Sequence, residues 1–120
     1  MWEAIKLSVL NDLAKAPAIN LIITGISLGG GLACVGFVDI LHAQLFSNVR
    51  VVTFGAPRVG NRAWAEWFDK NANLKRYYIR EDPIAFLPKS IPGICNYKPS
   101  GVAIRCDPDT QLCTELKPEE

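Results

Sequence analysis

The sequence predicts an α/β protein: a parallel sheet of about three strands with helices on its faces, followed by a C-terminal hairpin. Two observations support this fold class. Segments of helical and of strand character alternate along the 120 residues, and the strand-like runs are short and rich in β-branched residues. Such alternation is typical of βαβ units, in which crossover helices connect parallel strands.

The spacing of apolar residues defines the individual elements. Apolar residues recur at helical intervals from Trp2 to Leu13, and Pro17 ends the pattern, which predicts an amphipathic helix over residues 2–15. The other expected helices are 28–45 and a short helix capped by Asn61, and the expected strands are 20–24, 49–54 and 74–80. Because three strands leave both sheet edges bare, we expect residues 1–120 to be one partial domain.

Composition and charge exclude several classes of partner. The net charge is +1 and the basic residues are scattered, so no nucleic-acid partner is expected. Residues 21–38 carry no charge, but five glycines interrupt them, which favours a strand, turn and helix over a transmembrane segment. Glu3 and Lys6 break the apolar run that a signal peptide would need.

The four cysteines have different expected roles. Cys106 and Cys113 flank a turn, and a hairpin centred between Asp109 and Thr110 would place them opposite each other, which suits a disulfide and a secretory compartment. Two reduced cysteines in a surface hairpin remain an equal alternative. Cys34 is expected to be a small buried helix residue. No CxxC pair occurs, and the only histidine is distant, so neither a metal site nor a cofactor is expected.

The motif that carries chemistry is G-x-S-x-G, formed by residues 25–29. It follows an expected strand and opens an expected helix, as a nucleophile elbow does. Ser27 would then project above the carboxyl edge of the sheet, flanked by Gly25 and Gly29, which come close together in such a turn. The backbone N–H of Leu28 could donate to an oxyanion at the helix N-terminus. The alternative is a glycine-rich strand–helix turn without chemistry.

Three blocks of sequence resemble the class 3 (fungal-type) triacylglycerol lipases, which have the α/β-hydrolase fold. The first block is Thr24 to Ala33, around the G-x-S-x-G motif. The second, Thr53 to Asn61, is similar to that family's next signature block, and the third, Arg80 to Pro88, is similar to the block that supplies its acid. Against that family, the chain corresponds to a partial domain without the N-terminal strands and the C-terminal histidine-bearing segment.

The resemblance implies a role for individual residues. Ser27 matches the nucleophile, Asp82 the triad acid and Leu28 the backbone oxyanion donor. Independently, Asp82 follows an expected strand, so it should reach the same carboxyl edge of the sheet as Ser27. A turn-forming acid before Pro83 is the alternative for Asp82. For Arg58 we expect a loop contact, and for Trp64, Trp67 and Phe68 a core position rather than a lipid-binding face.

Two features depart from the family pattern. Ile26 stands where these lipases usually have histidine. The histidine at that position is not the triad base, so we expect the replacement to change packing only. More seriously, no histidine follows Asp82 in the chain. The only histidine, His42, lies fifteen residues beyond Ser27 on the same expected helix, roughly 22 Å away at a rise of 1.5 Å per residue, which is too far for a hydrogen bond.

The resemblance implies a carboxylic ester hydrolase, a lipase acting on lipid or small ester substrates through a serine nucleophile in a full-length parent protein. The same parent could contact a lipid interface and could be secreted. The alternative is a non-catalytic, truncated or degenerate lipase-like module, because the chain itself lacks the triad histidine. A histidine supplied by a longer chain would favour the first hypothesis.

Overall fold

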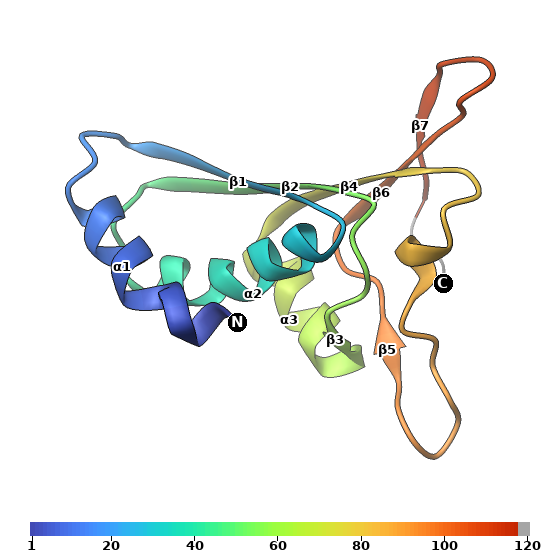
Figure 1. Ribbon diagram of the computed structural model, residues 1–120, viewed down its shortest axis with the longest axis horizontal. Coiled ribbons are helices and arrows are strands. Elements are labelled where there is room, and N and C mark those ends of the chain that lie inside the picture. Colours follow the sequence, from blue (N-terminus) through green and yellow to red (C-terminus); the bar gives the residue numbers. More distant parts are fainter. Residues whose placement is uncertain (118–120) are drawn as a thin grey trace.

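A five-stranded sheet organises the chain in the computed structural model, which describes residues 1–117 (Figure 1). Its strands lie in the order β1-β2-β4-β6-β7. Their bounds are β1 Asn20–Ile26, β2 Asn48–Phe54, β4 Asn73–Ile79, β6 Val102–Cys106 and β7 Cys113–Glu115. A separate two-stranded ladder pairs β3, Gly60–Asn61, with β5, Tyr97–Lys98.

The first four strands of the sheet are parallel, and β7 is antiparallel to β6. The three expected strands are confirmed as β1, β2 and β4. The expected number was nevertheless too small, because the hairpin of β6 and β7 belongs to the same sheet and β6 is a fourth parallel strand. The sequence did not predict β6 as a parallel strand because no crossover helix lies between β4 and β6. The connection contains only a four-residue 3₁₀ helix, η1 (Pro83–Phe86), and the short strand β5.

The three α-helices of the described part of the chain cover one face of the sheet (Figure 1). They are α1 Trp2–Ala14, α2 Leu28–His42 and α3 Arg62–Asn71. The expected packing of helices on the sheet is confirmed, and within residues 1–117 all of them lie on the same face. The reason is topological: the crossovers from β1 to β2 and from β2 to β4 move in the same direction, and right-handed crossovers that do so place their helices on the same side.

The hydrophobic core lies between this sheet face and the helices. It is formed by buried side chains from four elements: Ala33, Cys34 and Phe37 of α2, Val51 of β2, Phe68 of α3 and Leu74 of β4. The core position expected for the α3 aromatic residues is confirmed, since Phe68 is fully buried and both Trp64 and Trp67 pack against the cluster. The Asn61 cap is confirmed too, because its Oδ1 accepts the Trp64 N–H at 3.0 Å.

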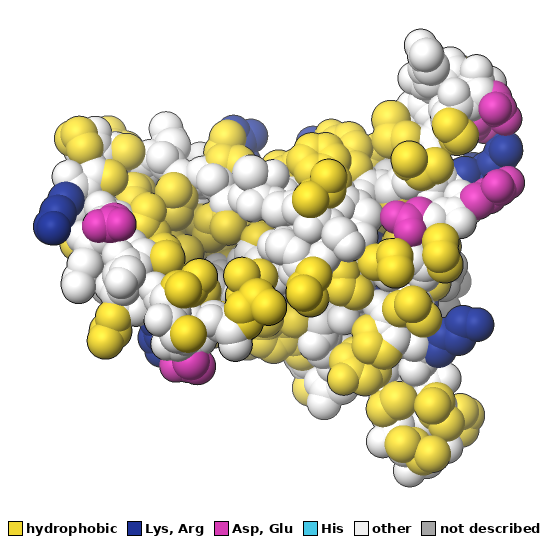
Figure 2. All heavy atoms as spheres, in the orientation of Figure 1, with side chains coloured by type: hydrophobic (Ala, Val, Ile, Leu, Met, Phe, Trp, Pro, Cys, Tyr) yellow, Lys and Arg dark blue, Asp and Glu magenta, His cyan; other side chains and the backbone are white. Residues whose placement is uncertain are grey.

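Among the described residues no helix covers the opposite face of the sheet, and the part of this face near the carboxyl edge is apolar. Side chains from the outward positions of three strands are exposed there: Ile22 and Ile26 of β1, Phe54 of β2 and Ile79 of β4. A second exposed apolar group projects from the loop before β5, at the lower right of Figure 2, where Ile94 is 80% exposed. The longest helix, α2, has 15 residues, and among residues 1–117 no helix meets the length and apolarity of a membrane span.

Helix α1 is attached to α2 by a polar contact with a pH-dependent strength. The Trp2 indole N–H donates to Asp39 Oδ2 at 2.7 Å, and Lys6 Nζ lies 3.2 Å from Asp39 Oδ1. The indole hydrogen bond, followed by the Lys6 ammonium, lowers the pKa of the Asp39 carboxyl. The contact therefore stabilises the fold above the unfolded-state pKa of aspartate, about 4, and this contribution is lost as the pH falls through the lower folded value.

We expect Asp39→Asn to lower the free energy of unfolding at pH 7 by about 1 kcal/mol or less, since the pair is partly exposed. The difference from the unsubstituted chain should shrink as the pH is lowered towards 3. Urea unfolding at both pH values measures it, with Asp12→Asn on the exposed side of α1 as the control. An equal difference at the two pH values would contradict the role of the ionised carboxylate.

Candidate active site

Ser27 is the single residue between β1 and α2, and its backbone is strained. It has φ of 51° and ψ of −126°, which L-residues rarely adopt. Its N–H donates to the carbonyl of Phe54 at 2.8 Å, so the end of the neighbouring strand β2 fixes the turn. The serine side chain is exposed at the carboxyl edge of the sheet. Strain held by a hydrogen bond at an exposed serine is the geometry of a nucleophile elbow.

The two glycines of the motif have unequal roles. A Cβ on Gly25 would overlap the backbone of Gly29 and come within 2.7 Å of the Gly30 nitrogen, so Gly25 cannot be replaced without moving the helix. A Cβ on Gly29, in contrast, would meet nothing within 4 Å. The expected close approach is present, but the steric requirement for glycine falls on Gly25 only.

Leu28 begins α2, directly after the serine. Its N–H belongs to the first turn of a helix, where amide groups have no partner within the helix. The carbonyl of Ser27 accepts the N–H of Gly30 at 2.9 Å, which sets the direction of this turn. The positive end of the helix dipole therefore lies beside Ser27, where it favours a developing negative charge.

Asp82 follows β4 by three residues and reaches the same edge of the sheet. Its Oδ1 accepts the N–H of Ile84 at 2.9 Å and caps η1, Pro83–Phe86. The turn role that the sequence offered as an alternative is thus present. The second oxygen, Oδ2, faces Gly55, where an added Cβ would lie 2.9 Å from it, and Gly55 itself has φ of 59°. Glycine at position 55 therefore leaves room for the carboxylate.

Ser27 and Asp82 line one cavity of about 510 Å³. This size is within the range of small-molecule sites. Most of the remaining lining is apolar and comes from the ends of β1, β2, β4, β6 and β7: Ile26, Phe54, Tyr77, Ile79, Cys106 and Cys113. The structure therefore brings the two predicted site residues together, next to an apolar surface that sequence reasoning did not identify.

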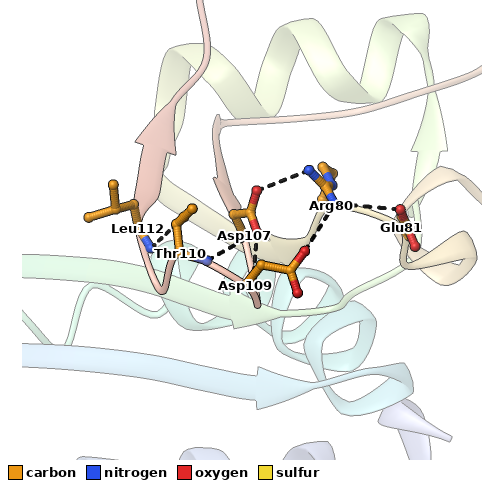
Figure 3. A network of polar contacts seen from close by, with 6 residues as sticks. All are labelled: Arg80, Glu81, Asp107, Asp109, Thr110 and Leu112. Carbon is orange, nitrogen blue, oxygen red and sulfur yellow. Dashed lines mark hydrogen bonds and ion pairs between the residues drawn. The ribbon is translucent and has the colours of Figure 1, made fainter.

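A polar network holds the end of β4 against the β6–β7 turn (Figure 3). The Arg80 guanidinium lies 3.0 Å from Asp107, 3.6 Å from Asp109 and 3.7 Å from Glu81, and the Arg80 N–H donates to the carbonyl of Cys106. The pKa of Asp107 is lowered, first by the backbone N–H of Asp109 and then by other groups that include Arg80. Arg80 precedes Asp82 by two residues, so the network fixes the strand end from which the acid emerges.

The disulfide is part of the cavity lining. Cys106 and Cys113 pair directly across β6 and β7 and form the bond in the structure. Cys34, in contrast, is buried in the core, and burial raises the pKa of its thiol to about 11, which keeps it protonated.

His42 does not approach the cavity. It lies in the last turn of α2, and its ring is 6.3 Å from that of Trp67, on the helix side of the sheet. Among the described residues, no group of three or more His, Cys, Asp or Glu side chains is arranged to hold a metal ion. The site thus consists of a serine, a carboxylate, a helix N-terminus beside the serine and an apolar lining.

The apolar lining could have been found from strand alternation. Ile26, Phe54 and Tyr77 are register neighbours across β1, β2 and β4, and their side chains lie on the open face. Each residue is at or near the last position of its strand. The apolar outward positions close to the carboxyl end of each strand therefore could have predicted the cavity lining from the sequence. The contribution of Cys106 and Cys113 depended on β6 joining the sheet, which the sequence did not reveal.

Among the solved structures that resemble this chain are fungal lipases. The lipase of Rhizopus microsporus var. chinensis superposes with a TM-score of 0.73 at 27% identity, covering 87% of this chain and 37% of that one. Lipase II from Rhizopus niveus, at 24% identity, shares the fold with a TM-score of 0.82 over 98% of this chain and 46% of its own.

The secreted mono- and diacylglycerol lipase 2 of Gibberella zeae is 31% identical over 104 residues, covering 74% of this chain and 26% of the relative. The chain thus spans about a quarter of the length of that protein. The family model described as Lipase (class 3) matches residues 1–91, which include the elbow, the loop after β2 and Asp82. This chain therefore belongs to the class 3 lipase family, as a part of its α/β-hydrolase domain.

Proposed function

We propose that the chain is the nucleophile-bearing part of a carboxylic ester hydrolase that acts on lipid esters. The observation that carries the proposal is the shared cavity: Ser27 on a strained elbow and Asp82 from another strand line one apolar space. Relatives that are named mono- and diacylglycerol lipases support lipid esters as the substrate class.

In the proposed reaction the hydroxyl of Ser27 attacks the ester carbonyl, the alcohol leaves, and water then hydrolyses the acyl-serine. The N–H of Leu28 stabilises the oxyanion, an interaction whose loss typically costs 10²–10³ in rate in serine hydrolases. The outward side chains of Phe54, Tyr77 and Ile79 hold the acyl chain. Asp82 orients a histidine that accepts the Ser27 proton and stabilises its cationic form.

That histidine is not among the 120 residues, because His42 is the only one and lies on the helix side of the sheet. The proposed relay is complete only when a longer protein supplies the base. The same observation supports a second candidate function, a non-catalytic lipase-like module. The two candidates differ in whether Ser27 reacts once a base is available.

A lipid interface is the proposed partner surface, with the loop before β5 as the contact. This loop exposes Ile91 and Ile94. The longer stretch that contains the loop, from Pro83 to Cys106, has no acidic residue. Lys89 and Lys98 flank the apolar tip, so their charges suit anionic headgroups while the isoleucines enter the acyl boundary.

Export from the cell is the proposed localisation of the parent protein. The Gibberella and Penicillium relatives are named as secreted, and the Cys106–Cys113 disulfide suits an oxidising compartment.

We expect the purified 120-residue chain to hydrolyse p-nitrophenyl butyrate no faster than its Ser27→Ala variant. An unassisted serine hydroxyl is a weak nucleophile at neutral pH, and no histidine is within reach. Release of p-nitrophenol under matched conditions measures it. Turnover that depends on Ser27 would show that another residue acts as the base.

Imidazole in solution should replace the missing base. With tens of millimolar imidazole, we expect p-nitrophenyl butyrate to acylate Ser27, detected as a mass increase of the intact chain and localised by peptide mapping. Ser27→Ala corrects for hydrolysis by imidazole itself, and Asp82→Asn should reduce the acylation rate severalfold because the imidazolium loses its partner. If imidazole produces no Ser27 adduct in the folded chain, the non-catalytic module is the better description.

Binding to anionic vesicles should depend on the loop tip. We expect Ile94→Asp to weaken co-sedimentation with phosphatidylcholine vesicles containing phosphatidylglycerol by about tenfold, since it places a charge in the acyl boundary. Ile19→Asp is the matched control, because Ile19 is 69% exposed but precedes β1 at the opposite edge of the sheet. Equal loss in both variants would exclude a specific role for this loop.

A further inference from the structure

A small cavity lies on the helix side of the sheet, where β2, α2, α3 and the loop over residues 55–60 meet. Its volume is about 10 Å³, which is close to the least space that one water molecule occupies. The residues that line it come from these elements and from the segment before β6; among them are Cys34, Thr53, Arg58, Trp64, Arg76 and Ser100. It is separate from the Ser27 cavity on the open face, with which it shares no lining residue.

Three buried polar atoms in these lining residues have no hydrogen-bond partner among the described residues. They are Thr53 Oγ1, Arg58 Nε and Trp64 Nε1. Thr53 is fully buried on β2, so its hydroxyl has no access to bulk solvent. A buried polar group without a partner costs about 1–3 kcal/mol, and native proteins rarely leave three such groups together.

The chemistry of the three atoms is complementary to a single water molecule. The Arg58 and Trp64 N–H groups only donate, and a water oxygen accepts two hydrogen bonds. The Thr53 hydroxyl can accept from one of the water protons in return. Ordered buried waters typically make about three such bonds, which matches this set.

The surrounding charge favours the same orientation. Arg76 on β4 is the register partner of Thr53 and lines the same cavity, and its Nε donates to the carbonyl of Ser100. Neither Arg58 nor Arg76 forms an ion pair with a described carboxylate. Two cationic groups near the cavity favour a water oxygen that points its lone pairs towards them.

We propose that this cavity is a binding site for one structural water molecule, which accepts hydrogen bonds from Arg58 Nε and Trp64 Nε1 and donates to Thr53 Oγ1. The site connects the loop over residues 55–60 to β2 and α3 at once. It is independent of the hydrolase proposal, since it uses none of the residues that line the Ser27 cavity.

The water acts as a positioning element because of what this loop contacts. Gly55 faces Asp82 Oδ2, Ala56 packs against Gly30 in the first turn of α2, and the Arg58 N–H donates to the carbonyl of Leu87. The loop thus lies between the elbow helix and the acid-bearing segment. The three-way hydrogen bond therefore holds this loop in place between the two segments.

Water-to-protein NMR transfer on the 120-residue chain tests the site. We expect the Trp64 Nε1–H to show a nuclear Overhauser effect to water with the sign of a long-lived complex. The Trp2 indole N–H, which donates to Asp39, is the internal control and should show none. Absence of the effect at Trp64 would overturn the proposal.

Two substitutions at position 53 separate the water from general packing. Thr53→Val keeps the shape but removes the hydroxyl; it should abolish the Trp64 water signal and lower the melting temperature by several degrees. Thr53→Ser should keep the signal. Thr24→Val on the exposed side of β1 should change neither quantity. A Thr53→Val variant as stable as the unsubstituted chain with the water signal intact would contradict the assignment.

A halide ion is the alternative occupant and is distinguished by the same spectra. If the Trp64 indole resonance shifts with bromide or chloride concentration at constant ionic strength, an anion binds there, and the water proposal is wrong. Resonances that are unchanged between halide-free sulfate buffer and bromide buffer, with the water signal retained, support it.

Discussion

The in-register parallel pairing of β1, β2 and β4 is the constraint on which the site depends. Ile26 pairs with Phe54 and Phe54 with Tyr77, so β1 and β2 end along one line and β4 continues past it to Ile79. Ser27 leaves β1 directly after this line, and Asp82 leaves β4 a few residues later. Because side chains alternate along a strand, a slip of one residue would turn the apolar outward side chains into the core and separate the two polar groups from their lining.

The two faces of the sheet are built differently, and the difference follows from the direction of the crossovers. The inner face meets α2 and α3 and contains the core, together with the buried polar groups of Thr53, Arg58 and Trp64. The outer face has no helix on it among residues 1–117 and contributes the apolar lining of the Ser27 cavity. The loop over residues 55–60 crosses from the outer to the inner face of the sheet. Gly55 borders the Ser27 cavity, and Arg58 lines the small cavity on the helix side.

Features that depend on local sequence were predictable. The strand–serine–helix turn at residues 25–29, the Asn61 cap and the core position of Phe68 all follow from short-range patterns. Features that depend on tertiary closure were not. Val102–Cys106 looked like half of an isolated hairpin because no crossover helix precedes it, yet it pairs with β4.

The same limit applies to the polar groups of the inner face. Positions 53, 58 and 64 show no common spacing in the sequence and share a cavity only once β2 and α3 are packed. The steric demand at Gly25 and its absence at Gly29 also required the backbone, since the motif treats both glycines alike.

The place of the disulfide in the cavity affects how the site can be labelled. Cys106 and Cys113 lie in the same lining as Ser27, and as a disulfide they offer no nucleophile. Reduction would place two thiols in the cavity, and a thiolate reacts with activated esters and other electrophiles far more readily than a serine hydroxyl without a base. The chemoselectivity of an electrophilic reagent directed at this cavity therefore depends on the redox state of the sample: in the reduced chain the two thiols would react in preference to Ser27, and in the oxidised chain they would not compete with it.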